Sequence, residues 1–266
     1  MASHFSSIGI PLSGKQEFQD YFEKAYHNGE HIKVREGTYL KWKVDNEVEL
    51  WGQFNNKNEA IGMNPHFFGT ARMKVLISER VNRPDDTELD GAFYAMTNTQ
   101  VGKNEGNGYP FVFDIPDICT YGNIKIPQVA VIQLTAFAHE IKGFESEEEY
   151  FDAQESDRKF AVESFIPSGL FKPDGETTTP PVAQAIFSGR IIDTEKRVNG
   201  HTNKEYIWAK IIVLGDEIDV VSDPEIVEGN LIKGGIISGS FWLTGRVLGD
   251  YEKEEKSFWK KLVGRK

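Results

Sequence analysis

Histidine and carboxylate side chains are the first candidates for chemistry in this chain, because together they can hold a metal ion. Six histidines are present. His27 and His31 have the spacing of one helix turn, but Gly29 between them is expected to end the helix and to remove the shared face. His139-Glu140 lacks the second histidine of a zinc-protease motif. No complete metal motif is present, and no cofactor is predicted.

Aromatic residues near the C-terminus offer a second kind of site. Residues 185–248 contain short segments rich in Ile, Val and aromatic residues, separated by Gly, Asn and Asp, as in a small sandwich or barrel. Such barrels often bind oligonucleotides or oligosaccharides through aromatic side chains on an exposed strand face. The competing interpretation is that these rings form the core. The candidate ligand-binding residues are Phe187, Tyr206, Trp208 and Trp242.

The charge balance narrows the choice of ligand. The formal net charge is −11 at pH 7, and residues 183–249 carry seven basic against nine acidic residues. A surface of this sign repels phosphate backbones at long range, so generic nucleic-acid binding is not expected. A basic protein partner or a small cationic ligand would be attracted instead.

The sequence contains no motif typical of nucleophilic or nucleotide-dependent catalysis. A Gly-x-Ser-x-Gly elbow, a P-loop and a dinucleotide fingerprint are all absent from the sequence. Cys119, the single cysteine, has no activating base near it in the sequence and cannot form an intramolecular disulfide. No catalytic residue is therefore predicted, and the balance is against an enzyme.

The N-terminal part reads as one helix followed by strands. Ser13 and Gln16 form a capping-box pattern, and Asn28-Gly29 predicts a left-handed stop. Between them lies an apolar stripe at helical spacing: Phe18, Tyr21, Phe22, Ala25 and Tyr26.

After this helix the hydrophobic period changes from 3.6 to 2. Leu40, Trp42 and Val44 share one strand face, and the returning strand places Glu49 and Trp51 opposite its apolar residues. Further strands are predicted at 70–81, 91–97 and 129–138, where the last, apolar on both faces, competes with a buried helix. A second capping box at Ser146 and Glu149 predicts a short acidic helix.

These elements indicate an α+β protein. An N-terminal mixed antiparallel sheet with one or two helices is followed by a small OB-like β-barrel, or by an open five-stranded sandwich, which fits nearly as well. The expected divisions are an acidic domain at 1–170, a Pro/Thr-rich linker at 171–182, an OB-like module at 183–249 and an amphipathic tail at 250–266. The module is expected to close as a unit of its own.

The N-terminal order of strand, helix and hairpin resembles a module of the vicinal-oxygen-chelate enzymes. Those enzymes hold a divalent metal with His and Glu on sheet faces, so the resemblance implies that Glu49, His66 and His139 would be the metal residues. The second βαβββ copy that those enzymes pair with the first is not evident in this sequence.

The leading functional hypothesis is a soluble, non-catalytic binding or interaction protein that engages a basic protein partner or a small ligand. The alternatives are a metal-dependent enzyme and an oligomeric structural component whose strand edges and tail form homo-oligomer contacts. The sequence shows no secretory signal and no apolar run of membrane-spanning length, so no membrane span and a cytoplasmic location are expected.

Overall fold

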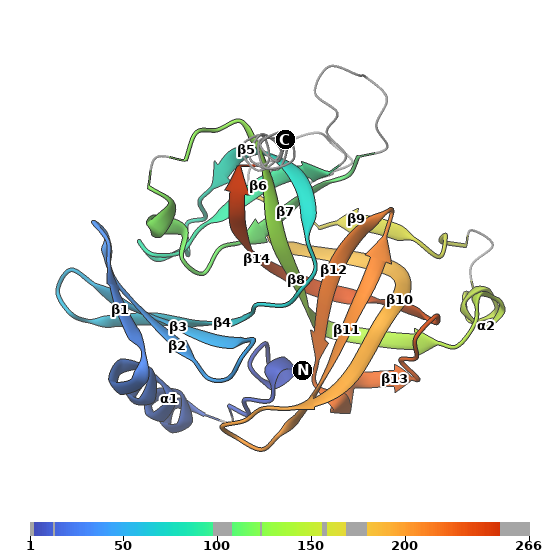
Figure 1. Ribbon diagram of the computed structural model, residues 1–266, viewed down its shortest axis with the longest axis horizontal. Helices are drawn as coiled ribbons and strands as arrows, with labels where there is room; N and C mark the ends of the chain where they lie inside the picture. The colour runs from blue at the N-terminus through green and yellow to red at the C-terminus, as the bar shows by residue number, and fades with distance from the viewer. Residues whose placement is uncertain are drawn as a thin grey trace, which may run out of the picture.

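Strands make up most of the molecule, and few helices accompany them, which is compatible with the α+β class (Figure 1). The computed structural model describes residues 3–12, 14–97, 108–122, 124–155, 159–168 and 180–250. None of the described helices combines the length and apolar character that a bilayer span requires.

Two sheets account for the strands in the described residues. The first, sheet A, is an antiparallel meander in chain order, preceded by helix α1. Its elements are α1 (Lys15–Asn28), β1 (Glu30–Lys33), β2 (Gly37–Lys43), β3 (Val48–Asn55) and β4 (Ala60–Phe67). The second, sheet B, has ten strands, which are β5 (Met73–Val81), β6 (Ala92–Thr97), β7 (Pro110–Asp114), β8 (Gln128–Phe144), β9 (Ser164–Pro167), β10 (Gln184–Val198), β11 (Glu205–Val213), β12 (Asp216–Ser222), β13 (Val227–Gly229) and β14 (Ile236–Asp250).

The long strands β8 and β14 form the centre of sheet B, where they pair antiparallel over most of their length. On one side, β8 continues through β12, β11 and β10 back to β14, with the β8–β12 pairing parallel. On the other side, β8 continues through β5, β6 and β7, and β7 meets β14 at the single pair Asp114 and Thr244. Both circuits of hydrogen bonds therefore share β8 and β14.

The segment predicted at 129–138 is a strand and not a buried helix, because it becomes the middle of β8. Its apolar character on both faces has a structural cause. Ile132, Leu134 and Ala136 point into the main hydrophobic core, whereas Phe137 joins a second core that contains residues of α1 and sheet A. A strand covered on both faces needs few polar positions.

The expectation that the C-terminal strands close by themselves is wrong. β8 belongs to the front portion of the chain, yet it pairs with both β12 and β14, so one sheet contains strands from both portions. The domain boundaries themselves stay a prediction. Most of the predicted linker, residues 171–179, and the tail beyond residue 250 lie outside the described residues.

Helix α1 is confirmed, but its predicted ending is not. Gly29 has φ −87°, which is extended backbone and not the left-handed region, and the chain enters β1 directly. Glycine is required there by space, since a Cβ would lie 2.5 Å from the carbonyl oxygen of Ala25 and 3.1 Å from that of Lys41. The predicted cap, Ser13, lies outside the described residues. The second capping box is confirmed, because the Ser146 side chain accepts from the Glu149 N–H at the start of α2 (Glu147–Asp152).

Sheet A has two unlike faces, as the alternation predicts. One face carries Leu40, Trp42 and Leu50, which pack with Phe22 and Ala25 of α1 in the second core. The other face carries polar and aromatic side chains that are also buried, among them Glu49, Gln53 and His66. A buried polar face needs partners, and these come from β14 and the loops of sheet B.

The close approach at Gly29 gives a test of the fold. Gly29→Ala is expected to lower the free energy of unfolding by about 1–3 kcal/mol, because the added methyl group must displace backbone. Gly200→Ala is the control, since its Cβ would meet only Asp45 Cβ at 3.7 Å. Urea denaturation of both variants measures the difference. Equal stabilities would contradict the placement of α1 on β2.

Candidate functional site

A row of polar side chains on β14 faces the polar side of sheet A. Along β14, Phe241 and Leu243 point into the main core, so the alternation of a strand turns Trp242, Thr244 and Arg246 to the opposite face. Each of these three side chains has a polar contact with another element of the structure.

Each member of the row has a different partner. The Trp242 indole Nε1 donates to Asp114 Oδ2 at 2.6 Å. Thr244 Oγ1 lies 3.4 Å from Nδ1 of His66 on β4. The Arg246 guanidinium donates to Asp117 Oδ2 at 3.1 Å.

A cavity of about 190 Å³ lies beside Trp242, between β4, the β5–β6 connection, β7 and β14. We call it the Trp242 cavity. Its walls carry three carboxylates and one guanidinium. The lining residues are Asn64, Arg83, Asp86, Asp90, Gly91, Asp114, Ile115, Pro116, Trp242 and Thr244.

Arg83 is held at the cavity wall by three contacts. Its Nη1 atom lies 2.8 Å from Asp114 Oδ1 and 3.7 Å from Asp86 Oδ1, and its Nε donates to the Pro181 carbonyl at 3.1 Å. Its Nη2 atom is buried and has no hydrogen-bond partner within the part of the chain that the structure describes. A buried charged donor without an acceptor is costly.

Asp90 is fixed from three directions. Its Oδ1 accepts from Gln53 Nε2 at 2.6 Å and from Asn64 Nδ2 at 2.9 Å, and its Oδ2 accepts from the Thr87 N–H at 3.0 Å. Because two of these donors lie on sheet A, the carboxylate also joins sheet A to the β5–β6 connection. The cavity wall is therefore organised before any ligand arrives.

The carboxyl group of Asp114, at the cavity wall, has a raised pKa. Burial raises the pKa of its carboxyl group, and the nearby Arg83 charge and the hydrogen bonds from Trp242 and Arg83 offset only part of that rise. Asp86 adds a further rise through like charge. A positive group in the cavity would stabilise the charged form of Asp114.

Behind the cavity, buried charges are paired with one another. Glu49 accepts from the Trp51 indole at 3.0 Å and lies 3.1 Å from Lys41 Nζ. The Oε2 atom that accepts from Trp51 also lies 3.7 Å from Arg246 Nη1, and Arg246 also contacts Asp117. Mutual pairing of this kind holds two sheets together, and removing one partner would leave a buried charge.

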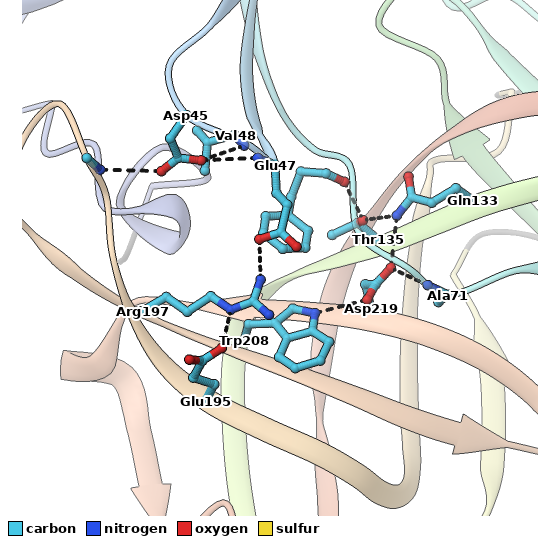
Figure 2. Close-up of polar contacts among 12 residues, drawn as sticks. Asp45, Glu47, Val48, Ala71, Gln133, Thr135, Glu195, Arg197, Trp208 and Asp219 are labelled. Atoms are coloured by element: carbon cyan, nitrogen blue, oxygen red, sulfur yellow. Dashed lines mark hydrogen bonds and ion pairs between the residues drawn. The ribbon is translucent and has the colours of Figure 1, made fainter.

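A second buried network, shown in Figure 2, centres on Asp219 of β12. Its carboxylate accepts from the Trp208 indole at 2.9 Å, from the Ala71 N–H at 2.8 Å and from Gln133 Nε2 at 3.2 Å. Gln133 in turn donates to Thr135 Oγ1, which donates to a carbonyl at the end of β4. This carboxylate is fully buried and supplied with donors, so its role is to fix the β4–β5 connection onto sheet B.

Arg197 covers the outer side of this network. Its guanidinium lies 4.1 Å from the centre of the Trp208 ring and bonds to Glu47 and Glu195 (Figure 2). The contact with Glu47 connects β10 to the β2–β3 turn. Trp208 is therefore held on its face by a cation and at its edge by a carboxylate.

The four predicted ligand-binding residues are not gathered in one place. Phe187 is stacked between Phe165 and Phe241 in the main core, and Tyr206 packs on Phe67 in the second core. Both are at most 2% exposed. Of the four, Trp242 lines a described cavity, and its role in ligand binding stays a prediction.

The implied metal residues are also divided. Glu49 and His66 are direct cross-strand partners on β3 and β4, and both are buried. His139 lies on β8, where its Nε2 is 2.8 Å from Nε2 of His4. Burial and the charges of Arg246 and Lys41 lower the pKa of His66 well below its usual value. Among the described residues, no group of three or more His, Cys, Asp or Glu side chains converges as a metal site.

The strand order around α1 also differs from the expected module. A 3₁₀ turn, η1 (Ser6–Ile8), and no strand precedes α1 within residues 3–12. The implied strand–helix–hairpin order is therefore not seen in that segment.

Arg83, Asp90 and Asp114 were missed at the sequence level. Arg83 and Asp86 belong to a polar turn between two strands, and Asp114 ends a short strand. No periodic pattern in the sequence shows that the turn with Arg83 and Asp86 lies beside Trp242, because Trp242 is more than 100 residues away along the chain.

Comparison of the chain with protein-family models, with curated proteins and with solved structures gives no match.

The Asp219 network gives a test of the structural role assigned to it. Trp208→Phe removes the indole donor and leaves one carboxylate oxygen poorly satisfied, so it is expected to cost about 1–3 kcal/mol more than Trp42→Phe. Both tryptophans are 7% exposed, which makes Trp42→Phe a control for lost ring volume. Urea denaturation at pH 7 measures both. Equal losses would show that the indole–carboxylate bond contributes nothing.

Proposed function

We propose that the protein is a non-catalytic binding protein and that its ligand, a small molecule carrying an amine, occupies the Trp242 cavity. The observation that carries the proposal is the set of charges around the cavity, which comprises Asp86, Asp90 and Asp114 against Arg83. Such a wall attracts a cation, in agreement with the net charge of −11 on the whole chain.

The geometry supports a ligand with a positively charged group. An amine in the cavity would interact with the carboxylates of Asp86, Asp90 and Asp114. The volume of about 190 Å³ is below the usual range for drug-sized ligands, so the molecule has few non-hydrogen atoms.

The strand pairings support a more specific description of the fold, an OB-like arrangement. The β10–β11–β12 meander, the parallel β12–β8 pair and the β8–β14–β10 connection support an OB-like arrangement in which β8 serves as the fifth strand. We include that arrangement, and a cytoplasmic location, in the proposal. The cytoplasmic location is supported by the single cysteine. A basic protein partner, a metal-dependent enzyme and an oligomeric component stay predictions.

The proposal is tested with two probes of similar size, ethanolamine and ethylene glycol, in isothermal titration calorimetry at low salt. Ethanolamine is expected to bind and ethylene glycol not, because only the amine is charged. Asp86→Asn is expected to weaken ethanolamine binding about tenfold, equivalent to ~1.4 kcal/mol.

The control for this variant is Asp193→Asn, which changes the net charge by the same amount at an exposed position. It is expected to bind ethanolamine like the unaltered protein. Equal binding of both probes, equal loss in both variants, or no heat from either probe would contradict the proposal.

A further inference from the structure

An apolar groove of about 380 Å³ runs along α1, between this helix and the β3–β4 hairpin. Helix α1 lies at the periphery of the molecule (Figure 1). Four aromatic side chains line the groove, namely Phe18, Phe22, Tyr26 and Phe54. The groove and the Trp242 cavity have no described lining residue in common, so this is a separate surface feature, which we call the α1 groove.

The aromatic rings of the α1 groove pack on one another, but they are not all covered. The ring of Phe54 lies with its centre 5.1 Å from that of Phe22 and 5.8 Å from that of Tyr26. Tyr26 is nevertheless 48% exposed. Aromatic side chains are enriched at protein interfaces, and exposed apolar surface with a polar rim is typical of such sites. The α1 groove therefore has the composition of a contact surface.

The polar side chains of the α1 groove form a row of regular spacing. Lys15, Gln19 and Glu23 all line the groove and are exposed. They follow one another at intervals of four residues, so they lie on the same side of the helix. Glu23 also lies 3.9 Å from His27, but both of these side chains are more than half exposed, so the carboxylate stays accessible. A cation and a carboxylate thus lie on either side of Gln19, each about 6 Å away along the helix axis.

This row is complementary in charge to an antiparallel copy of itself. In a two-fold symmetric contact, the same patch of each copy faces its own image. When two α1 helices lie antiparallel with Gln19 on the two-fold axis, Lys15 of each copy faces Glu23 of the other. A parallel arrangement would instead place Lys15 against Lys15 and Glu23 against Glu23, which is unfavourable. The charges therefore favour one orientation of a second copy.

We propose that the α1 groove is an interface between two copies of this chain, which pack with their α1 helices antiparallel. The aromatic side chains supply the apolar contact. The two Lys15–Glu23 pairs set the orientation, because exposed ion pairs contribute more to specificity than to affinity. The net charge of −11 on each copy opposes association at long range. Salt at physiological concentration screens charges more than about 8 Å apart, so it reduces this repulsion more than the close pairing.

The test is sedimentation velocity of the full chain over a series of protein concentrations at physiological salt. The mass is expected to rise with concentration from that of one chain towards that of two. Lys15→Glu and Glu23→Lys are each expected to weaken dimerisation at least about tenfold, because each variant opposes like charges at both ends of the interface. The double variant Lys15→Glu/Glu23→Lys is expected to dimerise like the unaltered protein, since it exchanges the two charges and restores both pairs.

The matched control is Lys33→Glu, which makes the same change of charge at an exposed position on β1 outside the groove. It is expected to dimerise like the unaltered protein, and circular dichroism checks that each variant is folded. A chain that stays monomeric throughout the series would overturn the proposal. So would a double variant that dimerises as weakly as the single variants, or a loss in Lys33→Glu equal to that in Lys15→Glu.

Discussion

The antiparallel pairing of β14 with β8 is the constraint on which the rest of the structure depends. It fixes which side chains of β14 enter the main core, among them Phe241 and Leu243, and which face sheet A. A shift of register by one residue would place Arg246 in the core and Leu243 against Glu49. Because the shifted register would bury a charged side chain and remove an apolar one from the core, the observed register is strongly specified.

The polar layer between the sheets contains two kinds of charged group: those paired within the protein and those that line the Trp242 cavity. Asp219 accepts three hydrogen bonds, and Arg246 is paired with Glu49 and Asp117, so these charges are compensated within the protein. The carboxylates of Asp86, Asp90 and Asp114 line the Trp242 cavity together with Arg83, so a positively charged ligand group can reach them there.

Much of the local structure could be predicted from the sequence. The alternation of Leu40 and Trp42 against Glu49 and Trp51 indicated two unlike sheet faces, and the helical stripe indicated α1, because each pattern depends only on near neighbours. The inclusion of β8 in the C-terminal strands could not be predicted, since strand pairing across the chain leaves no periodic trace.

The candidate site was predicted only in part. Trp242 was chosen for its ring, but its partner Asp114 lies 128 residues earlier, and Arg83 reaches the cavity from a turn. Likewise His139 was singled out with Glu49 and His66, whereas the structure pairs it with His4. Residue type indicated which side chains could do chemistry, and only the packing of distant segments decides which of them meet.

The central claim is that the polar row of β14 packs on sheet A through compensated charges, and a double-mutant cycle between Arg246 and Glu49 tests it most directly. The cycle compares the free energies of unfolding of Arg246→Met, Glu49→Gln and the double variant. The account predicts a coupling free energy of about 1–3 kcal/mol, because each single change leaves a buried charge without its partner. Additivity of the two changes to within about 0.3 kcal/mol would contradict it.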